Sequence, residues 1–278
     1  MNEKINIIFQ NENFLVVHKP SGVLAVPARF QEKDNRPCLI PSIINILNPD
    51  NEKYDEKHDG NNNKIKLYPV HRLDYEAQGL VLLAKNAKAH QIANNWFEKR
   101  EIKKHYEAIT EIKKPNHLKV DIDKLPTITM NHPALENLQI SNYEKEYEHW
   151  VSFLLRGKKR AYEVEAKRGK KSLTNAILLG KIIINQQTYL YWHLMPLTGR
   201  SHQLRYEFYK RGIPILGDTL YGASIASQLS ISLQSRHSIA LHAFKLDFSN
   251  CENASQEMKL PSIITSATML IDNYLLIT

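Results

Sequence analysis

The stretch HRLDYEAQGLVLLAK, residues 71–85, places a charged loop directly before an apolar run. Residues 80–84 are short, continuous and apolar, which is typical of a buried strand. The pattern then changes, because Asn86 can accept a hydrogen bond from an amide of a following helix, and apolar side chains recur at helical spacing over residues 89–97. A buried strand followed by a capped helix predicts a mixed α/β fold.

Short β-branched or aromatic runs in the rest of the chain predict that sheet dominates this fold. A short helix is expected after Pro41, because proline lacks the amide donor that is left unpaired in a first helical turn. A further helix is expected over residues 201–210. We see no internal repeat and no glycine- or serine-rich linker, so we expect a single domain over residues 1–278. The other predicted strands cover residues 5–9, 14–18, 105–112, 150–155, 174–179, 189–194 and 239–248.

Residues 48–66 interrupt the pattern, because the run NPDNEKYDEKHDGNNNK contains almost no apolar side chain. Such a segment cannot bury enough surface to offset the entropy that it loses on ordering, so we expect a mobile polar loop. The loop comes just before the charged segment and could serve there as a lid. A surface insertion without a catalytic role is the interpretation that we prefer.

The composition predicts a folded globular protein with a basic surface. Apolar residues make up 42% of the 278 residues and charged residues 24%, which allows a core without disulfides or a structural metal. The net charge of +8 indicates a polyanionic partner such as nucleic acid, although many basic proteins bind none. We take this excess of positive charge to be spread along the chain rather than packed into one tail.

The cysteines and the N-terminal sequence bear on the cellular compartment. Cys38 and Cys251 are too few and too far apart for a disulfide framework, and neither belongs to a cluster with zinc-ligand spacing, so we expect two free thiols. The sequence has no signal-peptide pattern and no long apolar run. We therefore expect a cytoplasmic protein in a reducing environment.

Two segments combine charge with a group that can take part in chemistry. Asp74 lies on a loop before an apolar strand, where it could reach the floor of a cleft, and His71 and Arg72 could attract a nearby phosphate. Lys104 and Tyr106 lie in KKHYEA, where cations suit phosphates and a flat ring suits an unstacked base. Taken alone, each segment favours a structural interpretation, which is a surface Asp–Arg pair for the first and a strand with a core tyrosine for the second.

Two further segments contain glycine turns. In LMPLTGRSHQLR, residues 194–205, the glycine permits a tight turn and the amides that follow suit an anion. Three basic side chains then crowd one and a half helical turns, either toward a ligand or as a solvated face. In GIPILGDTLYG, residues 212–222, we interpret the turn as structural and expect no catalytic role for Asp218. The three basic side chains are Arg200, His202 and Arg205.

In this order, the segments resemble the RluA family of pseudouridine synthases over nearly the whole chain. The resemblance implies a curved, mixed, largely antiparallel sheet with peripheral helices, split by a basic central cleft, and no S4-type domain before the first strand. It implies an enzyme that isomerises specific uridines to pseudouridine in structured RNA, either tRNA, large-subunit rRNA or both, as a monomer without a cofactor, a metal, a membrane or an obligatory protein partner. The matching segments are FLVVHKPSGVLAVP at 14–27, HRLD at 71–74, KKHYEA at 103–108, PLTGRSHQLR at 196–205, GIPILGDTLYG at 212–222 and LHAFKLDF at 241–248.

The resemblance also implies roles for individual residues. Asp74 would be the nucleophile that opens the glycosidic linkage, through an adduct with a sugar carbon or a ring carbon. Arg205 would pair with Asp74 and keep it ionised, so that Arg205→Ala would cost activity far more than stability. Tyr106 would stack on the uracil and help to remove the C5 proton, and Arg72 would fill the gap left by a flipped-out nucleotide. The other residues expected to contact RNA are His71, Lys104, Arg200, His202 and Gln203.

The chain departs from the family directly after HRLD. Many relatives have Thr-Ser-Gly there, whereas this sequence has YEAQG at residues 75–79, which keeps the glycine and loses both hydroxyls. We expect the nucleophile to be intact, with altered substrate contacts or rate. One alternative is an RNA-binding protein without activity, but such a protein has no chemical reason to keep Asp74, Tyr106 and Arg205 together. A hydrolase that uses Asp74 and His71 would explain neither the tyrosine segment nor the order of the others.

Overall fold

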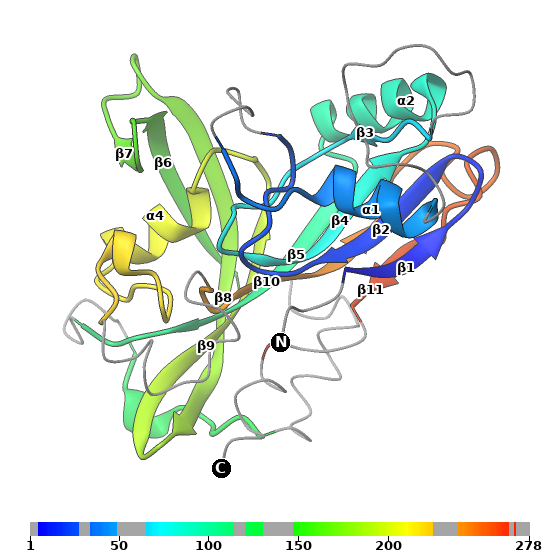
Figure 1. Ribbon diagram of the computed structural model, residues 1–278. Coiled ribbons are helices and arrows are strands. Elements are labelled where there is room, and N and C mark those ends of the chain that lie inside the picture. Colours follow the sequence, from blue (N-terminus) through cyan, green and yellow to red (C-terminus); the bar gives the residue numbers. More distant parts are fainter. Residues whose placement is uncertain are drawn as a thin grey trace.

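The computed structural model describes residues 5–27, 34–48, 65–113, 120–129, 147–224, 238–266 and 270. Within these residues eleven strands form one open sheet with few helices at its periphery (Figure 1). Most of the polar loop expected at residues 48–66 lies outside the described residues. The strands are β1 (Asn6–Gln10), β2 (Phe14–Lys19), β3 (Tyr68–Pro69), β4 (Gln78–Ala84), β5 (Lys103–Thr110), β6 (Glu148–Arg156), β7 (Ala161–Glu163), β8 (Lys170–Ile184), β9 (Gln187–Pro196), β10 (Leu241–Asp247) and β11 (Ile263–Thr265).

The sheet is mixed and largely antiparallel, as predicted. Its strand order is β1-β2-β4-β10-β5-β9-β8-β6-β7, with β3 beside β4 and β11 beside β10. Among the named strands of the described residues, β4 and β10 pair in parallel and every other pair is antiparallel. The helices are α1 (Leu39–Leu47), α2 (Ala87–Glu98) and α4 (Gln203–Lys210), and the short 3₁₀ turns are η3 (Ile122–Lys124) and η4 (Thr219–Tyr221).

Strand β4 is apolar without interruption because the sheet is covered on both faces there. Leu80 and Leu82 pack in one core cluster with Ala93 of α2, whereas Val81 and Leu83 pack in a second cluster that includes α1. Successive side chains of a strand point to opposite faces, so a strand between two helices has no face left for polar residues. The first cluster is a layer between the sheet and α2, and the second extends across the rest of the sheet.

The two predicted helix starts have different outcomes. The Oδ1 atom of Asn86 accepts a hydrogen bond from the amide of Ala89 at 2.8 Å, which confirms the predicted cap of α2. Helix α1 begins at Leu39, two residues before Pro41. Pro41 is still within the first turn, where its missing amide has no intrahelical partner to lose. The expectation of a short helix at this place is confirmed, but its start is earlier than expected.

Strands β8 and β9 are longer than the runs predicted at residues 174–179 and 189–194, and they form one long hairpin. Asn185 and Gln186 connect them with φ angles of 49° and 62°, as in a two-residue type I′ turn. Helix α4 begins at Gln203 rather than at residue 201, because His202 adopts a left-handed conformation with φ of 52°. The chain therefore turns sharply between the end of β9 and α4.

Candidate active site

A cavity of about 640 Å³ opens where the loop before β4, the start of β5 and the β9–α4 turn meet. The three segments are distant in sequence, and β10 and β9 on either side of β5 bring them together. All nine residues that the sequence predicted to act together lie in the wall of this one cavity. The predicted residues in its lining are His71, Arg72, Asp74, Lys104, Tyr106, Arg200, His202, Gln203 and Arg205.

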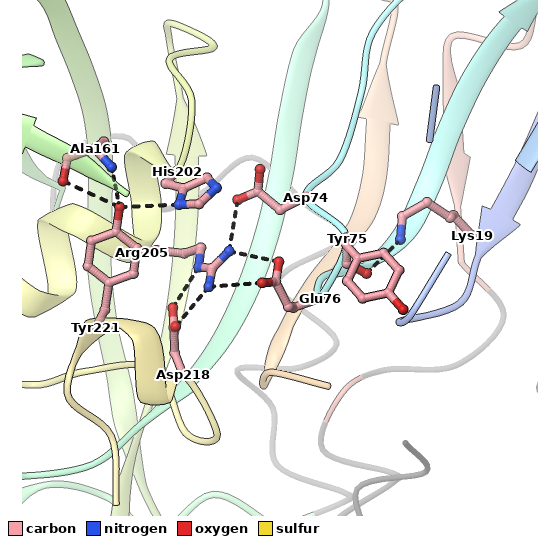
Figure 2. A network of polar contacts seen from close by, with 9 residues as sticks. All are labelled: Lys19, Asp74, Tyr75, Glu76, Ala161, His202, Arg205, Asp218 and Tyr221. Atoms are coloured by element: carbon pink, nitrogen blue, oxygen red, sulfur yellow. Dashed lines mark hydrogen bonds and ion pairs between the residues drawn. The ribbon is translucent and has the colours of Figure 1, made fainter. Parts of the chain in front are cut away.

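The segment that directly follows Asp74, residues 75–79, is held at both ends. The carbonyl of Tyr75 accepts hydrogen bonds from the amide of Gly22 at 2.8 Å and from Nζ of the buried Lys19 at 3.4 Å (Figure 2). At the other end, Gly79 has a φ angle of +123°, and a Cβ atom there would lie 2.3 Å from the carbonyl oxygen of Ala243. Only glycine fits such a backbone, so the loop enters β4 in one fixed position.

Arg205 lies at the centre of a polar network beside Asp74 (Figure 2). Its side chain is 1% exposed. The Nε and Nη2 atoms donate to the two carboxylate oxygens of Asp218 at 2.7 and 2.8 Å. Nη1 donates to Oε2 of Glu76 at 2.8 Å, and the Nη1–Oδ2 distance to Asp74 is 3.8 Å. The predicted pairing of Arg205 with Asp74 is therefore present as a long ion pair, shared with two closer carboxylates.

The charges in this network set the ionisation of its members. Burial alone would lower the pKa of Arg205, but the hydrogen bonds and charge of Asp218, followed by the charges of Glu76 and Asp74, raise it above its ordinary value. Burial raises the pKa of Asp218, and its hydrogen bonds to Arg205 offset part of that rise. One permanent cation thus faces three carboxylates, and the buried Asp218 depends on it for compensation.

Tyr106 faces the cavity from β5 and is 8% exposed. Burial raises the pKa of its phenol, and the negative charge of Asp74 raises it further. Both effects keep the hydroxyl protonated at neutral pH. The ring and the Asp74 carboxylate therefore lie in one pocket with the phenol as a hydrogen-bond donor and a flat surface for a base.

His71 and Lys104 are partly buried in the cavity wall, where both lie beside the Phe97 ring. Nε2 of His71 accepts a hydrogen bond from the amide of Leu82 at 2.9 Å, and its ring centroid lies 5.1 Å from that of Phe97. Burial lowers the pKa of His71 to about 3, and the charge of Lys104 adds to the shift, so His71 is neutral. Burial also lowers the pKa of Lys104 to about 8, and its Nζ lies 5.8 Å from the Phe97 ring.

The β9–α4 turn supplies side chains that line the cavity and a buried glutamine that holds the turn in place. Arg200 lies at the cavity wall, and its Nε donates to the carbonyl of Lys171 at 2.9 Å. Nδ1 of His202 lies 3.2 Å from the Tyr221 hydroxyl, and burial lowers the pKa of His202 while the charge of Asp74 offsets part of the shift. Gln203 is buried, and both ends of its amide bond to protein groups that include the Arg200 amide. Gln203 thus fixes the turn that presents its neighbours.

Glu76 and Asp218 are members of the network that the sequence did not indicate. Glu76 follows Asp74 by two residues in a turn, where the amide of Ala77 donates to the carbonyl of Asp74 at 3.2 Å, so no strand or helix spacing predicts where its side chain points. Asp218 was interpreted as part of a structural turn, and no spacing rule relates it to Arg205. Within the described part of the chain, no group of three or more His, Cys, Asp or Glu side chains could hold a metal ion. Among the same residues, no helix is long and apolar enough to cross a membrane.

Comparisons with known proteins agree with this geometry. The family model described as RNA pseudouridylate synthase matches residues 13–210. The chain belongs to this family. The match includes the Asp74 loop, strand β5 and helix α4, which are the three segments that meet at the cavity.

Individual relatives place the chain among the RluA-type pseudouridine synthases. It is 31% identical over 244 residues to the "Dual-specificity RNA pseudouridine synthase RluA" of Pasteurella multocida. This alignment covers 88% of this chain and 86% of the relative. It is 28% identical over 255 residues to the "Ribosomal large subunit pseudouridine synthase D" of Borreliella burgdorferi. This alignment covers 91% of this chain and 64% of the relative. The solved structure of "Human RNA Pseudouridylate Synthase Domain Containing 1" has the same fold, with a TM-score of 0.57, 20% identity, and 97% and 93% of the two chains covered.

Proposed function

We propose that this pseudouridine synthase isomerises uridines in tRNA, in large-subunit rRNA or in both, with Asp74 as its nucleophile. The observation that carries the proposal is the convergence of Asp74, Tyr106 and Arg205 on one cavity from three distant segments. A purely structural role explains each residue singly. It does not explain why a carboxylate, an aromatic ring and a buried cation share one solvent-accessible pocket in a member of this family.

Asp74 is suited to attack because its carboxylate is partly exposed, lies beside the Arg205 cation and is carried on a fixed loop. Its side chain is 19% exposed, so the carboxylate faces the cavity rather than the core. Attack on the sugar C1′ or on C6 of the ring forms one bond to the carboxylate, and the C1′–N1 bond breaks. The detached uracil then rotates, C5 bonds to C1′, and the carboxylate is released.

Tyr106 supplies the surface on which the uracil stacks while it is detached. Since burial raises the pKa of Tyr106, the phenol enters the reaction protonated. In that form it cannot itself act as the general base that accepts the C5 proton. The C5 proton would therefore pass to the released Asp74 carboxylate, directly or through the Tyr106 hydroxyl. Arg205 would stabilise the carboxylate in its ionised form before attack and after release.

The cations at the cavity wall fit the phosphates of a flipped-out nucleotide. Arg72 is exposed at the wall and could occupy the space left in the RNA stack. Lys104 and Arg200 could pair with flanking phosphates. His71, His202 and Gln203 are neutral and bonded to protein groups, so we assign them to holding the walls in place. We further propose that the enzyme acts in the cytoplasm as a monomer.

An RNA-binding protein without activity is the second candidate, and the YEAQG departure at residues 75–79 is the observation that favours it. The experiment that separates the two is a tritium-release assay with RNA labelled at uridine C5. Release by the wild-type protein supports isomerisation, because the C5 hydrogen is lost when the new C5–C1′ bond forms. Bound RNA without release from tRNA or rRNA would favour the second candidate.

A further inference from the structure

The positive charge of the protein is concentrated in one short region, contrary to the expectation that it is spread out. Residues 156–171 contain eight Lys or Arg and two Glu, so they account for six of the eight net positive charges of the chain. They form the turn between β6 and β7, the strand β7, and the turn between β7 and β8. We call this region the basic double turn. Its cations, all exposed, are Arg156, Lys158, Lys159, Arg160, Lys167, Arg168, Lys170 and Lys171.

The basic double turn is an ordered surface. The amide of Gly157 bonds to the carbonyl of Arg160 at 2.9 Å, and the amide of Gly169 bonds to the carbonyl of Glu165 at 3.1 Å. A Cβ atom at Gly157 would lie 2.8 Å from the Arg160 carbonyl oxygen, and one at Gly169 would lie 2.7 Å from the backbone of Phe153. Because both turns are packed this closely, the cations project from a fixed backbone.

The basic double turn continues the wall of the catalytic cavity. Arg156, at its start, lines the cavity, and Arg200 of the opposite segment donates to the carbonyl of Lys171 at its end. Figure 1 shows β6, β7 and the adjoining end of β8 extending past α4, and β6 and β7 are the last strands at this end of the sheet. An RNA strand whose target nucleotide enters the cavity would therefore pass over this surface.

Aromatic side chains interleave with these cations. Tyr162 is 46% exposed, and Tyr209 of α4 is 44% exposed with the Arg160 guanidinium 5.9 Å from its ring centroid. The acidic Glu163 is neutralised locally by Lys210 at 2.8 Å. Exposed rings beside cations suit RNA, since phosphates pair with the cations and unpaired bases can stack on the rings. A surface that served only solubility would need no exposed aromatic rings.

We propose that the basic double turn binds the phosphate backbone of the substrate RNA outside the catalytic cavity. The inference rests on the proposed function, because it takes RNA as the substrate. It adds a second contact region, which anchors RNA flanking the target and leaves the chemical step unchanged. Affinity for a long structured RNA then depends on this region, whereas turnover of bound RNA does not.

The test compares two fourfold variants with the same loss of charge. One carries Lys158→Gln, Lys159→Gln, Lys167→Gln and Arg168→Gln in the basic double turn. The control carries Lys88→Gln, Lys99→Gln, Lys124→Gln and Lys259→Gln, which are exposed cations of other elements and loops. Neither set lines the cavity. The dissociation constant for total tRNA is measured from 50 to 200 mM salt in both variants, together with kcat on saturating tRNA.

The proposal predicts that the slope of log K against log salt becomes shallower in the first variant and stays unchanged in the control. Each lost phosphate contact removes roughly 0.7–0.9 from the slope of log K against log salt, so four contacts remove about 3. Affinity at 50 mM salt falls at least tenfold, with kcat within twofold of the wild-type value. Equal weakening in both variants, or none in either, overturns the proposal. Absence of turnover by the wild type itself would instead overturn the proposed function.

A second inference comes from the hydrogen bonds of Arg205. A guanidinium has five N–H donors in one plane. Asp218 accepts from Nε and Nη2, and Glu76 accepts from Nη1 at 2.8 Å and Nη2 at 3.4 Å. These contacts engage four of the five donors and leave one N–H, on Nη1, for Asp74 at 3.8 Å (Figure 2). Two carboxylates thus fix the plane and the direction of the cation.

We infer that Glu76 is a positioning residue, which holds Arg205 so that its remaining N–H is directed at Asp74. Asp218 alone fixes one edge of the guanidinium and leaves it free to swing about the Asp218 contact. Glu76 accepts hydrogen bonds from Nη1 and Nη2, at the end of the guanidinium, and it lies on the same loop as Asp74, two residues away. The position of Arg205 is therefore coupled to the position of the nucleophile. This inference also rests on the proposed function.

Three variants at this position separate positioning from general stability. Glu76→Ala removes both acceptor atoms, Glu76→Gln keeps one of them at the same reach, and Glu76→Asp keeps the charge on a shorter side chain. We expect Glu76→Ala to lower kcat on total tRNA at least tenfold with KM within twofold, and Glu76→Gln to recover most of the loss. Unchanged kcat in Glu76→Ala overturns the inference, and so does equal loss in the Gln and Ala variants. Melting curves of each variant show that the comparison is made on folded protein.

Discussion

Arg205→Ala is expected to destabilise the protein as well as inactivate it, because it leaves the buried Asp218 carboxylate without its cationic partner. Asp218 is 1% exposed, and Arg205 is the cation that donates to both of its oxygens. Removing one partner of a buried ion pair costs about 3–5 kcal/mol. For a chain of this size, that corresponds to a melting temperature lower by roughly 6–20 °C. The sequence-based expectation, that the substitution costs activity far more than stability, is therefore replaced.

The destabilisation should also depend on pH, with a sign that the structure fixes. Burial already raises the pKa of Asp218 above its unfolded value, and without Arg205 it rises further. A buried carboxyl with a raised pKa destabilises the fold above that pKa and ceases to do so as the pH falls and the group is protonated. The loss in Arg205→Ala should thus be larger at pH 8 than at pH 5.

The assay is thermal or urea unfolding of the wild type, Arg205→Ala and the double variant Arg205→Ala/Asp218→Asn at both pH values. The double variant removes the buried charge together with its partner, so it should recover most of the stability and remain inactive. An Arg205→Ala protein within about 1 kcal/mol of the wild type at pH 8 would refute the reasoning, since a lone buried carboxylate costs more. So would a double variant that is no more stable than the single one.

Further substitutions test other parts of the account. Gly79→Ala should cost roughly 2–6 kcal/mol and fail to accumulate as soluble protein, because a Cβ would lie 2.3 Å from the Ala243 carbonyl oxygen at a positive φ; normal yield and melting temperature would contradict this. Asn86→Ala should cost about 1 kcal/mol in urea unfolding through loss of the α2 cap, with unchanged activity. Burial lowers the pKa of Lys104 to about 8, so tRNA affinity should fall between pH 7 and pH 9 as this charge is lost, and Lys104→Gln should flatten that profile; a parallel decline in the variant would exclude Lys104 as the titrating group. Tyr106→Phe keeps the stacking surface, so tRNA binding should stay within about twofold, while loss of the hydroxyl should lower kcat by about 10²-fold.

The sequence predicted the elements whose patterns are local. The apolar run at residues 80–84 and the cap at Asn86 are confirmed, because burial on both faces and capping are both properties of neighbouring residues. The ends of β8 and β9 were missed, since the first residues of β8 are polar and a β-bulge between Leu178 and Gly180 interrupts its pattern before the run at residues 181–184. The left-handed conformation of His202 was also missed, because it is imposed by the turn between β9 and α4 rather than by a preference of histidine.

The candidate site was predicted as a set of residues but not as a network. Motif order brought Asp74, Tyr106 and Arg205 together. The contact between Arg205 and Glu76 joins residues that are 129 positions apart, and no spacing rule predicts such a contact. The concentration of charge in residues 156–171 was visible in the sequence, yet its meaning depends on the position of those turns beside the cavity, which only the fold provides.

The most direct test of the central claim is tritium release from RNA labelled at uridine C5, with the wild type and Asp74→Asn compared on total tRNA and on rRNA separately. The substitution removes the nucleophile with little change in volume, and melting curves and tRNA binding serve as controls for folding. The account predicts release by the wild type from at least one RNA pool and none by Asp74→Asn, which should still bind RNA within a few-fold. Release by a folded Asp74→Asn protein at a rate near that of the wild type would contradict it.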